Sequence, residues 1–129
     1  MHRVRVLLVD QNSDHVESLR LLFEHRSCLV LSAASSRSAL PQVEAHRPDA
    51  LVVDVELPGV ATLCEWARAR NKLGAWIVGL TTSPDNDPCG CDVLVRKPYR
   101  FDDIARRLDA FIAHRSEQKR AAVAEGGEG

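Results

Sequence analysis

Five short runs of apolar and β-branched residues recur along this chain, and their spacing limits the folds open to it. They cover residues 4–9, 29–31, 51–53, 76–80 and 93–95. None alternates cleanly between apolar and polar positions, which is typical of strands buried on both faces. Segments with helical spacing separate the runs, so the order predicts an α/β fold with a parallel sheet covered by helices on both sides.

One connection departs from this alternation. Residues 83–90 contain two prolines, one glycine and three Asp or Asn residues, so we expect a loop or a single turn there instead of a full helix. After Ala113 the apolar pattern fades. We therefore expect one domain over residues 1–114, followed over residues 115–129 by a helix extension and a flexible Gly-rich tail.

Composition excludes several classes of protein. The chain has 129 residues, 45% of them hydrophobic, and a net charge of -1. This charge argues against direct electrostatic binding to nucleic acid or to a membrane surface, and no apolar run approaches the ~20 residues of a membrane span. The four cysteines are scattered, and Cys89 and Cys91 are too closely spaced for a zinc pair. We expect a cytoplasmic protein with free thiols.

Polar residues follow the predicted strands. In an open parallel sheet, ligands bind beyond the carboxyl ends of the strands. The residues found there are Asp10, Ser32, Asp54, Thr81 and Lys97. The carboxylates of Asp10 and Asp54 would repel each other unless a cation lies between them or one is protonated. Such a site suits Mg²⁺ and a phosphate, and a carboxylate can attack a phosphoryl group to form an acyl phosphate. Thr81 and Lys97 could then bind two of the phosphoryl oxygens.

Several motifs of other enzyme classes are missing. The first glycine is Gly59, so the turn over residues 10–13 has neither a dinucleotide fingerprint nor a phosphate-binding loop. No Gly-x-Ser-x-Gly motif occurs, and no cysteine has an evident histidine partner. The sequence therefore argues against NAD, FAD, nucleotide triphosphatase and acyl-transfer chemistry.

Four segments resemble the receiver domain of two-component response regulators. They are Leu-Leu-Val-Asp-Gln-Asn at 7–12, Leu-Val-Val-Asp-Val-Glu-Leu-Pro-Gly at 51–59, Gly-Leu-Thr-Thr at 79–82 and Val-Arg-Lys-Pro-Tyr at 95–99. The resemblance covers roughly residues 4 to 113. It implies a flavodoxin-like (βα)5 domain, doubly wound, with strand order 2-1-3-4-5, here with a shortened or missing fourth helix.

The resemblance also implies roles for individual residues. Asp54 would be the phosphoacceptor, and a histidine kinase or a histidine phosphotransfer protein would donate the phosphoryl group. Mg²⁺ would be bound by Asp10, Asp54 and the backbone carbonyl of Glu56. Thr81 would be the switch hydroxyl, and Lys97 the lysine typical of the family, in a Lys97–Pro98 peptide that is often cis.

The sequence departs from the family at three places. Gln11 stands where a second acidic residue is usual, so we expect weaker Mg²⁺ binding. Leu94 replaces the aromatic residue that usually moves with the threonine. The short fourth connection removes part of the face that receivers use to dimerise or to dock on targets. Trp66 or Trp76 could belong to a different contact surface that replaces it.

Three functions remain open at this point. The first is a stand-alone receiver that is phosphorylated on Asp54 and signals through protein contacts with a downstream target or as a homodimer. The alternative is a pseudo-receiver, a binding or dimerisation module independent of phosphorylation. The third is a phosphohydrolase with Asp54 as nucleophile and Glu56 as general acid, although the chain lacks room for the usual cap domain. Beyond self-phosphorylation and autodephosphorylation, we expect no enzymatic activity.

Overall fold

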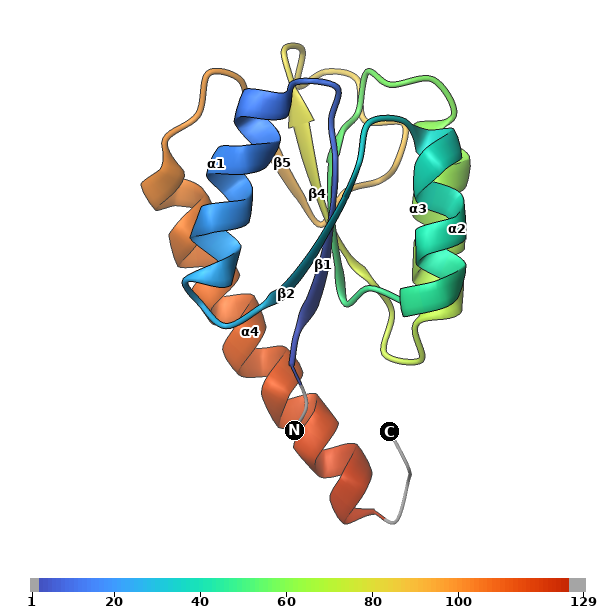
Figure 1. The fold of residues 1–129 in the computed structure, drawn as a ribbon, viewed down its shortest axis with the longest axis vertical. Helices are drawn as coiled ribbons and strands as arrows, with labels where there is room; N and C mark the ends of the chain where they lie inside the picture. Colours follow the sequence, from blue (N-terminus) through green and yellow to red (C-terminus); the bar gives the residue numbers. More distant parts are fainter. Residues whose placement is uncertain (1–2, 126–129) are drawn as a thin grey trace.

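One parallel sheet, with the strand order β2-β1-β3-β4-β5, organises the chain (Figure 1). The computed structural model describes residues 3–125, so the expected tail at 126–129 lies outside the described residues. The strands are β1 (Arg5–Val9), β2 (Leu29–Ala33), β3 (Ala50–Asp54), β4 (Trp76–Thr81) and β5 (Val93–Arg96). The helices are α1 (Ser13–Glu24), α2 (Ser36–His46), α3 (Val60–Arg70) and α4 (Phe101–Ala124). The predicted flavodoxin-like fold and its strand order are confirmed.

Apolar residues on both faces of the strands build two separate cores. Along β1, Leu7 and Val9 belong to the core under α2 and α3, whereas Val6 and Leu8 belong to the core under α1 and α4. Figure 1 shows the two helix pairs on opposite sides of the sheet. Because successive side chains of a strand point to opposite faces, a strand buried on both sides must be apolar throughout. This explains why apolar and polar residues do not alternate along the strands.

The connection between β4 and β5 contains turns and no helix, as the sequence predicts, and all of it lies within the described residues. The carboxylate of Asp87 accepts hydrogen bonds from the backbone N–H groups of Cys89 and Cys91. This turn directs the Cys91 side chain toward Gly79, where an added Cβ would lie only 2.5 Å from Sγ. The free thiol of Cys91 therefore fills space over β4, and burial is the main reason that the pKa of Cys91 is raised.

The two tryptophans have different environments. Trp76 stacks on Phe111 of α4 with the ring centroids 4.5 Å apart, so it contributes to the core. Trp66 on α3 is 37% exposed and lies under the guanidinium of Arg70, 3.9 Å from the ring centroid. Of the two, Trp66 is therefore the one available to a surface contact.

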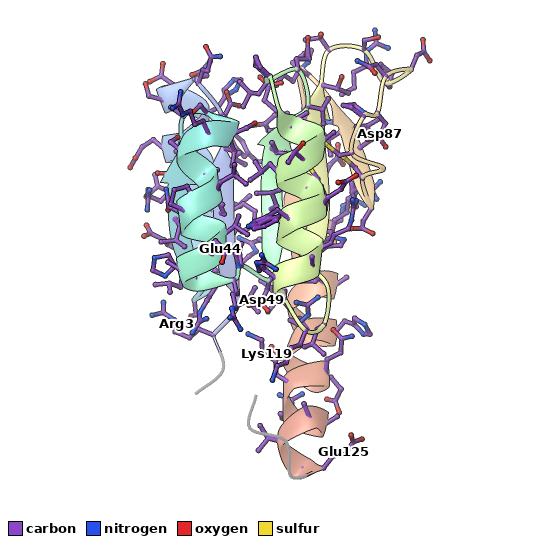
Figure 2. The ribbon with its side chains drawn as sticks, turned by 90° about the vertical axis from the view of Figure 1, so that its right-hand side faces the viewer. Arg3, Glu44, Asp49, Asp87, Lys119 and Glu125 are labelled. Carbon is purple, nitrogen blue, oxygen red and sulfur yellow. The ribbon has the colours of Figure 1, made fainter. Side chains whose placement is uncertain are left out.

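The amino ends of the strands are held to α4 by a buried ion-pair network around Asp49. This carboxylate is only 2% exposed and contacts Arg115 Nη1 at 3.0 Å and Lys119 Nζ at 2.9 Å. It also accepts the backbone N–H of Arg5 and the side-chain amide of Asn71. Figure 2 shows Asp49 and Lys119 together where α4 passes the sheet, and α4 continues beyond it.

We predict that Asp49→Asn lowers the free energy of unfolding by about 3 kcal/mol or more, because it leaves the buried guanidinium of Arg115 unpaired. Chemical denaturation monitored by tryptophan fluorescence measures this. The exposed pair Arg120–Glu117 offers a control, since Glu117→Gln should cost less than about 0.5 kcal/mol. An equal loss in the two variants would contradict the prediction.

The loss in Asp49→Asn should also depend on pH. Burial opposes ionisation of Asp49, but hydrogen bonds from Arg5 and Lys119 outweigh it and lower the pKa below its ordinary value of 3.8. Because the pKa of Asp49 is lower in the folded protein than in the unfolded chain, ionisation of this carboxyl group favours the folded state. Its contribution to the free energy of unfolding is fully present above the unfolded-state pKa and is lost as the pH falls through the folded-state pKa. The difference between the two proteins should therefore be constant near neutral pH and shrink once the pH falls below about 4.

Candidate functional site

Asp10 lies directly after β1, at the carboxyl edge of the sheet. The residue is buried, with 6% of its surface exposed. Its Oδ1 atom accepts a hydrogen bond from the Asn12 N–H at 2.9 Å, and the side chain of Asn12 in turn caps the first turn of α1. Its Oδ2 atom is buried and has no hydrogen-bond partner among the described residues. A buried carboxylate oxygen of this kind requires a cation or a water molecule.

Asp54 is the last residue of β3, the strand next to β1. Its Oδ1 atom accepts a hydrogen bond from the Glu56 N–H at 2.9 Å, which fixes the orientation of the carboxylate. The side chain is 17% exposed, so it can be reached from solvent. The turn that follows, Leu57-Pro58-Gly59, leads into α3 with Gly59 at a φ of 76°. This left-handed backbone conformation suits glycine at that position.

Lys97 brings a positive charge close to both carboxylates but forms a hydrogen bond only with Asp54. Its Nζ atom lies 3.4 Å from Asp54 Oδ2 and 3.9 Å from Asp10 Oδ2. At an effective dielectric constant of about 20, each attraction is worth about 4 kcal/mol before desolvation, which offsets much of the repulsion between the carboxylates. The lysine backbone is held by its N–H bond to the Thr81 carbonyl at 2.7 Å, and the Lys97–Pro98 peptide is cis.

The hydroxyl of Thr81 is used by a neighbouring turn. Thr81 is 1% exposed, and its Oγ1 atom donates to the Ser83 carbonyl at 2.9 Å and accepts from the Ser83 N–H at 3.0 Å. The residue therefore lies at the end of β4, beside the end of β3, with both hydrogen-bonding functions of its hydroxyl engaged. To bind a group on Asp54, Thr81 must release Ser83.

The side chain of Glu56 connects the β3–α3 loop to the end of β4. It accepts the backbone N–H of Thr82 at 3.0 Å and the Thr82 hydroxyl at 2.8 Å. These hydrogen bonds, the backbone one first, lower the pKa of Glu56 below its ordinary value. A carboxyl group that stays ionised at neutral pH is a poor general acid, which argues against the phosphohydrolase hypothesis.

Ser32 lies differently from the expectation, because it is inside β2 and does not follow it. Its hydroxyl accepts a hydrogen bond from Arg20 at 2.9 Å. Gln11 is exposed to solvent. Leu94 is partly buried and packs against the core under α2 and α3. Ser32 therefore takes no part in the cluster around Lys97.

Sequence reasoning missed two residues of this edge, His15 and Tyr99. The His15 side chain is partly exposed, but its Nδ1 atom is buried and lies 3.7 Å from Asp10 Oδ2. The Tyr99 ring lies 6.1 Å from the His15 ring, and burial, followed by the charge of Asp10, raises the pKa of Tyr99. The position of His15 in the first turn after β1 was the available signal, because that turn returns toward the strand end.

The donor set of this edge fits a hydrated cation. Within residues 3–125, no group of three or more His, Cys, Asp or Glu side chains is arranged to hold a metal ion. Mg²⁺ usually takes only one or two carboxylates from the protein and keeps several waters. Asp10, whose buried Oδ2 lacks a donor, together with Asp54, meets that requirement.

Comparison with known proteins identifies the family. The profile described as "Response regulator receiver domain" matches residues 6–109, which is most of the chain. The chain belongs to the response regulator receiver domain family. Receiver domains take part in two-component signalling and generally bind Mg²⁺ at their acidic phosphorylation site. The resemblance in the four sequence segments is thereby confirmed.

Individual relatives agree with this assignment. The transcriptional regulatory protein KdpE of Mycobacterium tuberculosis (strain CDC 1551 / Oshkosh) is 26% identical over 113 residues, which cover 83% of this chain and 50% of the relative. YvrH of Bacillus subtilis (strain 168), another transcriptional regulatory protein, is 28% identical over 126 residues, which cover 92% of this chain and 53% of the relative. The chain thus spans about half the length of these curated relatives.

Solved structures show the same fold. A putative response regulator from Chloroflexus aurantiacus J-10-fl has a TM-score of 0.72 and 28% identity, covering 87% of this chain and 99% of that one. A CheY-like receiver domain protein from Methanospirillum hungatei JF-1 has a TM-score of 0.78 and 19% identity, covering 91% of this chain and 99% of that one.

Among the residues that the structure describes, no helix is both long enough and apolar enough to cross a membrane.

We predict that Thr82→Val raises the pKa of Glu56 part of the way to its ordinary value. The substitution removes the hydroxyl donor but keeps the backbone N–H, which is the larger cause of the shift. Carboxyl ¹³C NMR during a pH titration measures this pKa. Ser83→Ala is the control, because only the backbone of Ser83 contacts Thr81. If Thr82→Val left the pKa of Glu56 unchanged, the hydrogen bond from the hydroxyl would have no electrostatic role.

Proposed function

We propose that this receiver accepts a phosphoryl group on Asp54 from a phosphohistidine of a histidine kinase or a histidine phosphotransfer protein. The observation that carries the proposal is the Lys97 ammonium, 3.4 Å from Asp54 Oδ2 and 3.9 Å from Asp10 Oδ2. This arrangement supports the proposal because a carboxylate that could act as the nucleophile lies beside a positive charge at the partly exposed edge of the sheet.

The proposed reaction is a phosphoryl transfer. A carboxylate oxygen of Asp54 attacks phosphorus, the phosphorus–nitrogen bond of the donor breaks, and its electron pair remains on the imidazole nitrogen. The product on Asp54 is an acyl phosphate. Lys97 lies where it can neutralise one phosphoryl oxygen, and the Glu56 N–H keeps the carboxylate oriented during the attack.

Mg²⁺ would be held by Asp10, Asp54 and the backbone carbonyl of Glu56, and it would withdraw negative charge from the phosphoryl group. Gln11 in place of a second acid leaves the site with one negative charge fewer than the family pattern. The protein residues must therefore hold the cation with less electrostatic attraction, so we propose weak Mg²⁺ binding.

The signal would leave through Thr81 and the segment after it. A phosphoryl group on Asp54 offers the Thr81 hydroxyl a charged acceptor, which forms stronger hydrogen bonds than the neutral Ser83 carbonyl that it now contacts. Release of Ser83 would change the surface of the β4–β5 connection. We propose that this surface contacts a downstream protein, or a second copy of the chain in a homodimer, without direct binding to nucleic acid or membrane.

We propose that the receiver acts in the cytoplasm, where response regulators usually act. We propose no enzymatic activity for this receiver other than self-phosphorylation from a phosphodonor and autodephosphorylation.

A pseudo-receiver is the second candidate, and two observations favour it. The hydroxyl of Thr81 already has both a donor and an acceptor partner in Ser83, and Leu94 cannot provide an aromatic ring that follows its movement. In that case the same fold acts as a binding or dimerisation module with no response to phosphorylation.

Incubation with acetyl phosphate and Mg²⁺ separates the two candidates. We predict a mass gain of one phosphoryl group in intact-mass spectrometry, which is lost in Asp54→Ala and retained in the loop variant Asp85→Ala. Asp85 is exposed in the β4–β5 connection, so its removal controls for a general loss of acidic residues. If the protein gained no mass and did not bind beryllofluoride, the pseudo-receiver would be the correct function.

A further inference from the structure

The sheet has two edge strands, β2 and β5, and they are protected differently. The outer side of an edge strand presents backbone N–H and C=O groups that no strand of its own sheet pairs. On β2, the Arg20 side chain of α1 donates to the Val30 carbonyl at 3.3 Å. The Gln42 side chain of α2 donates to the Ser32 carbonyl at 2.7 Å. Side chains of two helices therefore occupy the edge at β2.

The edge at β5 has no such protection. The nearest side-chain hydrogen bonds involve Asp92 and Lys97, which flank the strand, and none within residues 3–125 reaches the backbone of Val93–Arg96. All four residues of β5 are at least partly exposed, whereas β1, β3 and β4 are mostly buried. Figure 2 shows Asp87, in the helix-free connection that leads into β5, on the side of the molecule away from Glu44 of α2.

The sequence around this edge is complementary to itself. It reads Asp92-Val93-Leu94-Val95-Arg96. If two copies of this segment run antiparallel about Leu94, each leucine lies opposite its own copy, and Val93 lies opposite Val95. Asp92 of each chain then lies opposite Arg96 of the other. A parallel pairing would place like charges opposite each other, which is unfavourable.

We propose that β5 pairs with β5 of a second copy of this chain in antiparallel orientation, so that two sheets join into one across a two-fold axis at Leu94. Backbone hydrogen bonds between the two edge strands make the contact, as in other complexes formed by strand addition. A two-fold axis makes both halves of the contact identical, which the self-complementary segment satisfies. The inference goes beyond the proposed function, because it requires no phosphoryl group on Asp54.

Both charged groups are available for this contact. The Arg96 side chain is exposed and has no ion-pair or hydrogen-bond partner in the part of the chain that the structure describes. Asp92 accepts the Ile77 N–H through Oδ2 at 2.7 Å, and its Oδ1 atom has no donor among the same residues. Within one chain, four residues of strand separate Asp92 and Arg96 by about 13 Å, more than the screening length of about 10 Å. Their charges therefore pair across the axis and not within one chain.

Sedimentation velocity of the full chain over a range of concentrations, without a phosphodonor, tests the proposal. We expect a reversible dimer, and a weak one because β5 has only four residues. Arg96→Glu places a carboxylate opposite Asp92 of the second copy at two symmetric positions, so it should weaken dimerisation by about 10-fold or more. Arg37→Glu is the matched control, because it makes the same charge change at an exposed position of α2 and should alter dimerisation by less than about twofold.

A second substitution tests whether the two charges meet. Asp92→Asn removes the charge but keeps an oxygen that can accept the Ile77 N–H. In this background Arg96→Glu should weaken dimerisation at least about threefold less than in the unmodified protein, because the repulsion between the two carboxylates is gone. Equal effects of Arg96→Glu in the two backgrounds would overturn the proposed pairing.

NMR of the unmodified protein gives a readout that needs no variant. In an equal mixture of isotope-labelled and unlabelled chains, filtered NOE spectra should show contacts between Leu94 of the two copies and between Val93 and Val95. A monomer at every concentration, intermolecular contacts confined to another surface, or an equal loss of dimer in Arg37→Glu would overturn the proposal. Phosphorylation of Asp54 is measured separately with acetyl phosphate, so each of the two proposals can fail while the other holds.

Discussion

The parallel pairing of the central strands is the constraint on which the site depends. Val9 of β1 pairs with Val53 of β3, and Asp54 of β3 pairs with Leu80 of β4, so these strands end at nearly the same level. Asp10 and Asp54 are thereby forced into one small region, where their charges repel. The lysine after β5 relieves that repulsion, and helices on both faces exclude water from the strands below.

Two buried aspartates at opposite edges of this sheet show how stability and function are separated. Asp49, at the amino edge, has donors on both oxygens from Arg115, Lys119 and other groups, and it connects the sheet to α4. Asp10, at the carboxyl edge, keeps one oxygen without a donor. A satisfied carboxylate strengthens the fold, whereas an unsatisfied one costs free energy that a bound cation can recover. The carboxylate oxygen without a donor therefore lies at the edge where a phosphoryl group would bind.

Much of the fold followed from sequence patterns, because strands buried on both faces and helices with apolar stripes leave few arrangements open. The missing fourth helix was predictable from the prolines and the glycine of residues 83–90. The positions of Asp10, Asp54 and Lys97 also followed, since each stands at a strand end. The sequence could not show that the Thr81 hydroxyl is bound to Ser83 or that the Nδ1 atom of His15 is buried beside Asp10, because these depend on side-chain rotamers and on packing between distant segments.

We propose that the carboxyl edge of the sheet responds to a phosphoryl group while the amino edge stays fixed. Two-dimensional ¹H–¹⁵N NMR of the full chain, recorded before and after addition of beryllofluoride and Mg²⁺, tests this most directly. We predict shifts of the backbone signals of Glu56, Thr82 and Ser83, with those of Asp49 and Arg115 unchanged. Unchanged signals at the carboxyl edge, or shifts confined to the network around Asp49, would contradict it.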